Sequence, residues 1–96
     1  MNITLQQDQL LFKDHYQWPQ LPEQDPRISG DLSETLFEPE DGNQVLYFIN
    51  KLLAVWKFDE MKYARKIEKM IKVGLPENIG TQINAKAWIK DHWGNY

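Results

Sequence analysis

The sequence contains no cysteine, and this absence excludes several classes of site at once. A disulfide, a thiolate metal centre and a cysteine nucleophile are all ruled out. Long apolar stretches are missing too: the longest runs from Leu52 to Trp56, far shorter than the about 20 residues that cross a bilayer. The first residues also lack the basic and apolar segments of a signal peptide. We therefore expect a cytoplasmic protein that makes no membrane contact.

Motifs for catalysis and ligand binding are equally scarce. The five glycines are isolated, so the sequence has no phosphate-binding loop, and no calcium-loop spacing follows Asp41. The two histidines, His15 and His92, have no set of metal ligands and no nucleophile beside them in the sequence. An enzyme whose site combines distant residues, such as His15 with Glu34, is therefore the least supported hypothesis. We expect no catalytic residues, no metal and no cofactor.

What the sequence does have is an uneven distribution of charge. Residues 1–42 carry nine acids and two bases, a net charge of −7, whereas residues 43–96 carry nine bases and five acids, a net charge of +4. The total of −3 conceals this division. Such an asymmetry indicates either a charged partner or one half of the chain folding against the other. An acidic segment that covers a basic surface of the same molecule is one form of the second possibility.

The acidic segment, residues 1–40, also holds four of the five prolines. Because proline disfavours helix in the residue before it, this arm should be largely extended. Asp31 and Glu34 have the spacing of a capping box, which predicts one short helix over residues 31–37. The arm contains too many apolar residues for a disordered tail, so we expect it to pack partly across the rest of the protein.

Residues 41–96 predict a domain of three helices, which makes the fold class mostly α. The first helix covers residues 43–57 and is capped by Asp41. The second covers residues 59–73; it is capped by Asp59, stapled by Phe58 and Tyr63, and closed by a glycine cap at Gly74. The third covers about residues 81–93, where apolar residues recur every four positions.

The second predicted helix gives the clearest candidate site. Four cations share one of its faces, and we name them the basic row: Lys62, Arg65, Lys66 and Lys69. Such a face can contact nucleic-acid phosphates, an acidic protein surface or anionic lipid. The more ordinary interpretation, which we favour, is the solvent-exposed side of a core helix.

The tryptophans give the second candidate. Trp56 and Trp88 are expected in the core, whereas Trp18 and Trp93 are candidate interface anchors. The leading functional hypothesis is a small non-enzymatic protein–protein interaction module, such as an adaptor, an inhibitor or an immunity or assembly factor. The alternative is a nucleic-acid-binding protein that uses the basic row, although the pI of about 5.3 argues against it. A homodimer through an exposed apolar helix face is a further alternative.

Overall fold

The computed structural model describes residues 5–22, 24–25, 27–30 and 32–95 of the chain. Its main elements are the helices α1 (Gly42–Val55), α2 (Met61–Lys69) and α3 (Gln82–Asp91). A π-helical turn, η3 (Met70–Gly74), prolongs α2, and short 3-10 turns lie near both ends. Apart from two isolated β-bridges, the described residues form no β-structure. The predicted mostly α fold of three helices is therefore confirmed.

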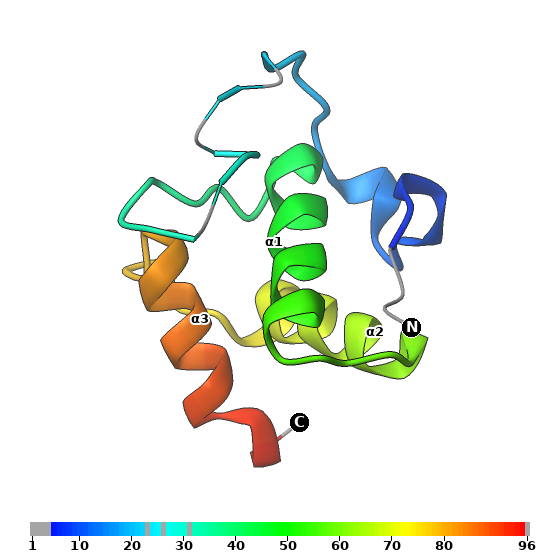
Figure 1. The fold of residues 1–96 in the computed structure, drawn as a ribbon, viewed down its shortest axis with the longest axis vertical. Coiled ribbons are helices and arrows are strands. Elements are labelled where there is room, and N and C mark those ends of the chain that lie inside the picture. Colours follow the sequence, from blue (N-terminus) through cyan, green and yellow to red (C-terminus); the bar gives the residue numbers. More distant parts are fainter. Residues whose placement is uncertain (1–4, 23, 26, 31, 96) are drawn as a thin grey trace.

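Helix α1 lies at the centre, with α2 crossing near its C-terminal end and α3 beside it (Figure 1). Asp41 caps it as predicted, because its carboxylate accepts hydrogen bonds from the backbone N–H groups of Asn43 (2.9 Å) and Gln44 (3.4 Å). The Gln44 amide donates to the same carboxylate (2.8 Å) and accepts from the N–H of Glu38 (2.9 Å). The N-terminus of α1 is thus tied directly to the end of the arm.

Helix α1 ends in a Schellman motif, a turn that satisfies the last carbonyls of a helix. The N–H of Phe58 donates to the carbonyl of Leu53 (2.9 Å), and the N–H of Lys57 donates to the carbonyl of Ala54 (3.3 Å). Lys57 occupies the left-handed position of the motif, with φ of 57°. This turn directs Phe58 toward Tyr63 at the start of α2.

The ends of α2 differ from the prediction. Glu60, not Asp59, is the N-cap residue, and its side chain makes no capping hydrogen bond. At the other end the helix widens into η3, where the N–H of Leu75 donates to the carbonyl of Met70 (2.9 Å). Gly74 lies inside this π turn, and its φ is not positive, so the predicted glycine cap is wrong. Instead of a glycine cap, the i to i+5 hydrogen bond of the π turn gives the Met70 carbonyl its partner near the end of the helix.

The predicted short helix over residues 31–37 is also wrong within the described residues 32–37; Asp31, its proposed cap, lies outside them. This segment runs along the start of α3. The carbonyls of Thr35 and Ser33 accept from the N–H groups of Gln82 (3.0 Å) and Ile83 (2.9 Å). The first N–H groups of a helix have no partner within that helix. Residues 32–37 therefore form no helical turn, because these two carbonyls pair with the first N–H groups of α3 and not with N–H groups of their own segment. The Thr81 hydroxyl completes the cap of α3 by accepting a hydrogen bond from the backbone N–H of Asn84 (3.3 Å).

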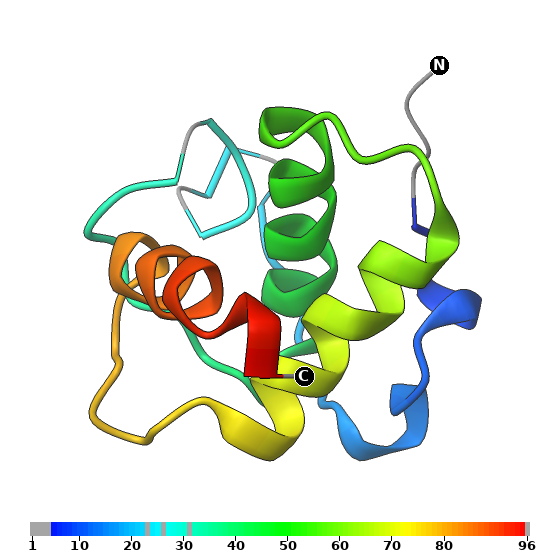
Figure 2. The ribbon, with the colours of Figure 1, turned by 90° about the horizontal axis from the view of Figure 1, so that it is seen from below.

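The described part of the arm wraps around α1 and packs across the helices, as expected (Figures 1 and 2). It passes along one side of α1, crosses over its N-terminal end and descends toward the start of α3 (Figure 1). Four of its apolar side chains are buried in the core: Leu5, Leu10, Tyr16 and Phe37. The arm is therefore an integral part of the folded domain.

Polar side chains of the helices hold the backbone of the arm. The Asn50 amide on α1 accepts from the N–H of Leu5 (2.6 Å) and donates to its carbonyl (3.0 Å). On α3, the fully buried Gln82 accepts from the N–H of Ser33 (3.2 Å) and donates to the carbonyl of Arg27 (3.1 Å). Because an unpaired buried amide is costly, these bonds fix the path of the arm as well as stabilise it.

Candidate functional site

Four aromatic rings meet where the end of α1, the start of α2 and the 3-10 turn η4 (Trp93–Asn95) come together. We name this cluster the aromatic corner; its members are Trp56, Phe58, Tyr63 and Trp93. Phe58 stacks on Tyr63 (ring centroids 4.3 Å apart) and on Trp93 (5.5 Å), while Trp56 meets Trp93 edge-on (6.1 Å). All four rings pack against the core and remain partly exposed.

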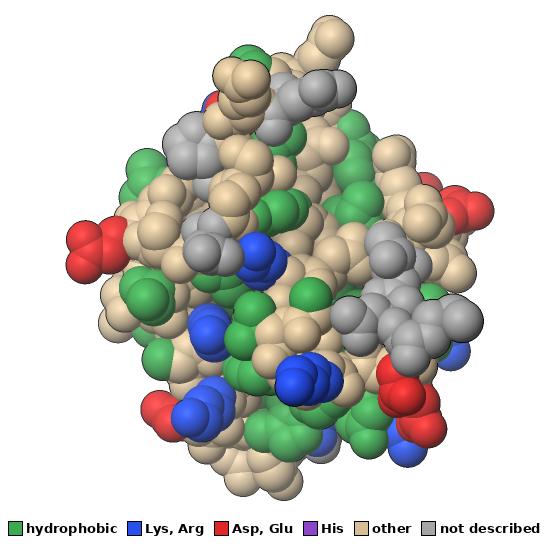
Figure 3. Space-filling view, viewed as in Figure 1, with side chains coloured by type: hydrophobic (Ala, Val, Ile, Leu, Met, Phe, Trp, Pro, Cys, Tyr) green, Lys and Arg blue, Asp and Glu red, His purple; other side chains and the backbone are tan. Residues whose placement is uncertain are grey.

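The aromatic corner encloses a shallow apolar hollow of about 260 Å³. Its walls are Trp56, Phe58 and Trp93, and the exposed Lys90 of α3 stands beside them. The Lys66 ammonium of α2 lies 4.2 Å from the centre of the Trp93 ring, a cation–π contact. The structure therefore brings together two of the predicted site residues, Lys66 and Trp93, and adds Lys90. Figure 3 shows basic and apolar side chains interspersed over the lower part of one face.

The rest of the basic row has varied surroundings. Lys62 pairs with Glu60 (2.9 Å) and lies 5.2 Å from the centre of the Tyr63 ring. The hydrogen bond to Glu60 and the negative charge of Glu60 raise the pKa of Lys62. Arg65 and Lys69 are exposed. In this way two of the four cations of the row lie against aromatic rings of the corner, and two face solvent.

Trp18 lies at the opposite end of α1 and is not part of this cluster. Its ring covers Gly42 at the start of the helix and meets Tyr16 edge-on (6.2 Å). Since α1 has 14 residues, about 20 Å of helix separates Trp18 from the aromatic corner. Its contacts explain Trp18 as a half-buried part of the packing between the arm and the helix. Its role as a binding residue stays a prediction.

In the part of the chain that the structure describes, no ion pair joins an acid of the arm to the basic row. Among the described residues, the recorded ion pairs are Arg27–Asp25 (2.6 Å) and Lys62–Glu60, and each joins residues two apart in sequence. The Arg27 guanidinium lowers the pKa of Asp25 to about 2, chiefly through their side-chain hydrogen bonds. The described part of the arm is held instead by apolar burial and by hydrogen bonds to its backbone.

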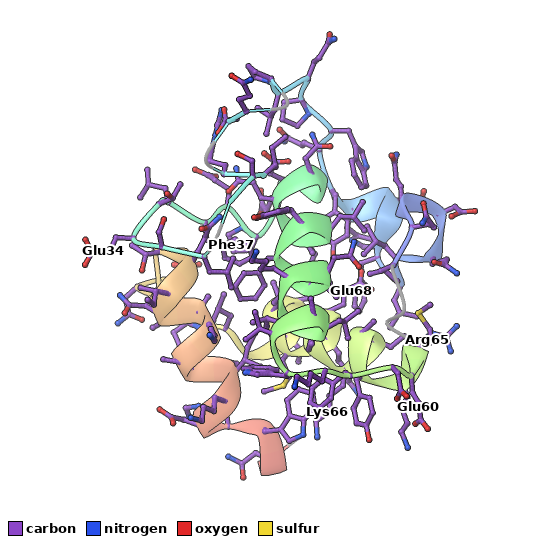
Figure 4. The ribbon with its side chains drawn as sticks, viewed as in Figure 1. Glu34, Phe37, Glu60, Arg65, Lys66 and Glu68 are labelled. Carbon is purple, nitrogen blue, oxygen red and sulfur yellow. The ribbon has the colours of Figure 1, made fainter. Side chains whose placement is uncertain are left out.

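The single acid of α2 that contacts the arm does so as a hydrogen-bond acceptor. The Glu68 carboxylate is almost completely buried and receives the backbone N–H groups of Leu11 (2.7 Å) and Phe12 (3.0 Å). It also receives the hydroxyl of Tyr16 (2.8 Å), whose ring faces the Lys72 ammonium at 4.4 Å. Burial raises the pKa of Tyr16 well above its usual value, and the hydrogen bond to Glu68 and the negative charge of Glu68 raise it further. Figure 4 shows Glu68 between α1 and the first part of the arm.

The histidines and Glu34 take no part in a comparable arrangement. His92 stacks on Trp88 (4.5 Å) and bonds its carbonyl through Nδ1 (2.8 Å), while His15 lies edge-on to Phe12 (6.0 Å). Glu34 points outward at the edge of the molecule (Figure 4). Within the described part of the chain, no group of three or more His, Asp or Glu side chains is placed to hold a metal ion.

Part of this site differs from the predictions made from the sequence. Trp56 and Trp88 were expected in the core, but both are only partly buried, and Trp56 forms one wall of the hollow. The contact between Phe58 and Tyr63 was predicted as a hydrophobic staple and is confirmed. Lys90 lies between the aromatic residues of the third helix in the sequence, but its position at the hollow follows only from the packing of α3.

Comparison with known proteins gives no further constraint on the site. No protein family, curated protein or solved structure matches this chain. None of the helices in the described residues is long and apolar enough to cross a membrane. The function therefore has to be argued from the geometry of the aromatic corner and its lysines.

Proposed function

We propose that the protein is a non-enzymatic protein–protein interaction module that binds its partner through the aromatic corner. The observation that supports the proposal is the apolar hollow walled by Trp56, Phe58 and Trp93. Tryptophan and tyrosine are enriched among the residues that dominate binding energy at protein interfaces. Their half-exposed rings offer a large apolar area with little side-chain entropy to lose on binding.

The scaffold around the corner supports this role. Its rings come from the end of α1, the start of α2 and η4, all of which pack against the core. Because the rings also stack on one another, the corner is pre-organised, which lowers the entropic cost of association. We propose the cytoplasm as the location, since a cysteine-free chain fits a reducing compartment.

Nucleic-acid binding is the second candidate function. It draws support from the position of Lys66 over Trp93, because single-stranded binders combine lysines with aromatic stacking platforms. Against it, Lys62 is already paired with Glu60 and the whole chain carries a net charge of −3.

A homodimer is the third candidate. It draws support from the apolar side chains of Leu36 and Val73, which are 65% and 66% exposed and would be available for an apolar contact between two copies.

Affinity capture from the source cells tests the proposal. The tagged full-length protein is compared with Lys90→Glu, which alters the rim of the hollow, and with Arg65→Glu, a matched charge reversal away from it. We expect a stoichiometric partner protein that survives nuclease treatment, binds Arg65→Glu normally and is lost from Lys90→Glu. Failure of Lys90→Glu to change any captured protein would contradict the proposal.

The same experiment separates the other candidates. Partners that disappear on nuclease treatment of the wild-type protein would favour nucleic-acid binding. Sedimentation of the purified protein at rising concentration reports a homodimer, and capture of untagged copies of this chain would agree with it.

A further inference from the structure

We infer that the aromatic corner receives an acidic peptide segment of the partner. A bulky apolar side chain of that segment enters the hollow, and carboxylates on either side of it face Lys66 and Lys90. This inference rests on the proposed function and specifies the chemistry of the partner. Three features of the corner support it: the size of the hollow, the charge around it and the backbone conformation of Lys57.

The size and lining of the hollow fit one side chain. At about 260 Å³ it is smaller than the roughly 300–1,000 Å³ of pockets that bury a drug-sized molecule. Its walls are aromatic, so the matching group is apolar rather than charged. Interfaces are commonly anchored in this manner, by one large side chain that enters a preformed pocket on the partner.

The charges around the hollow are mainly positive. Lys66 and Lys90 come from different helices: Lys66 lies over the Trp93 ring, and Lys90 lines the hollow beside it. Glu60, at the start of α2, pairs with Lys62, while Asp91 follows Lys90 in the chain and is exposed. A partner segment with acidic residues flanking its anchor would complement this surface and associate faster.

Lys57 adds an observation of a different kind. It is exposed and stands in the chain between Trp56 and Phe58, two walls of the hollow. Its φ of 57° is the left-handed conformation at which helices usually place glycine. A lysine is strained there, and strained backbone conformations concentrate at functional sites. A lysine kept at this turn at the expense of stability fits the recognition of an acidic segment.

The ring contacts favour a peptide over single-stranded nucleic acid. Bases bind such proteins by stacking on open aromatic faces. Here Phe58 stacks on both Tyr63 and Trp93, and Lys66 lies over the Trp93 ring. The flat faces of Phe58 and Trp93 are therefore engaged within the molecule, while Trp56 meets both rings edge-on and walls a hollow for a side chain.

A random-peptide display library, selected on the immobilised full-length protein, tests the inference. We expect enriched peptides in which Asp or Glu flanks a Trp, Phe, Leu or Ile residue. Synthetic copies should bind Lys66→Glu and Lys90→Glu at least about tenfold more weakly than wild type, since each substitution replaces attraction by repulsion. Arg65→Glu, which makes the same charge change 100° around α2 from Lys66, should bind them like wild type.

Three outcomes would overturn the inference: no enriched motif, a motif without acidic residues, or equal weakening by Arg65→Glu. A labelled oligothymidylate that binds more tightly than every selected peptide, and that loses binding in Lys66→Glu, would also overturn it in favour of nucleic acid. If cellular capture succeeds while the library yields a non-acidic motif, only the partner chemistry is wrong. If both fail, the interaction module itself is wrong.

Discussion

The hydroxyl of Tyr16 donates a hydrogen bond of 2.8 Å to the Glu68 carboxylate, and this contact joins the arm to α2 across 52 positions of sequence. The same carboxylate accepts the backbone N–H groups of Leu11 and Phe12. A buried carboxylate is tolerated only where hydrogen bonds replace its lost hydration. Here the arm supplies all three of the recorded donors, so the burial of Glu68 and the position of the arm depend on each other.

Replacing Glu68 with glutamine should loosen the arm. The amide offers one acceptor oxygen in place of two and turns an N–H₂ group toward the donors from Leu11, Phe12 and Tyr16. We expect the free energy of unfolding to fall by about 2–3 kcal/mol. Chemical denaturation measures this loss, and hydrogen exchange should show faster exchange at the Leu11 and Phe12 amides.

The matched control is Glu77→Gln, which makes the same change at an exposed glutamate. It should alter stability by less than about 0.5 kcal/mol. Unchanged exchange at Leu11 and Phe12 in Glu68→Gln would show that the bonds to Glu68 are not needed to hold this part of the arm.

The raised pKa of Tyr16 predicts a loss of stability at alkaline pH. Its pKa in the folded chain lies above the unfolded value of 10.0, so the unfolded state releases this proton first as the pH rises. The contribution of Tyr16 is therefore complete below pH 10 and declines above it. Tyr16→Phe should unfold with a flatter dependence on pH between about 9 and 12, although it is about 1 kcal/mol less stable at neutral pH. Parallel curves for the two proteins would contradict the prediction.

The sequence predicted those elements whose signals are local. The apolar face and the Asp41 cap lie within α1 or next to it, so both could be recognised from spacing alone. The contact of Phe58 with Tyr63 was equally predictable. The segment before Phe37 was not, because its capping pattern competes with bonds to α3, which lies some fifty residues away in sequence.

The position of Glu68 within α2 also carries a signal in the sequence. It is four residues after Ala64 and three before Ile71, and both of these are buried. It therefore lies on the apolar stripe of α2, where a charged residue needs partners. The pattern indicates that partners exist, but which part of the chain provides them depends on the return path of the arm. The position of Trp93 in the aromatic corner likewise depends on the turn that follows α3, so it could not be predicted from the sequence.

Substitution of Gly42 by alanine should destabilise the protein although it adds a better helix former. A Cβ atom at this position would lie 2.5 Å from the ring of Trp18, too close for either group to stay in place. We expect the displaced ring to cost about 1–3 kcal/mol, more than the gain in helix propensity. Gly94→Ala is the control, since no atom lies within 4 Å of its added Cβ. Equal stability of the two variants in thermal unfolding would show that Trp18 moves without cost.

Glycine at position 57 should make the protein more stable and a weaker binder. Glycine adopts the left-handed conformation of Lys57 without strain, so Lys57→Gly should raise the free energy of unfolding by about 1 kcal/mol. Lys57→Ala removes the same charge but retains a Cβ atom, and it should leave stability nearly unchanged. Both variants should bind the acidic peptides less tightly, because each loses a cation beside Trp56 and Phe58. If Lys57→Gly gains stability with no loss of binding, the lysine at this turn serves neither the fold nor the partner.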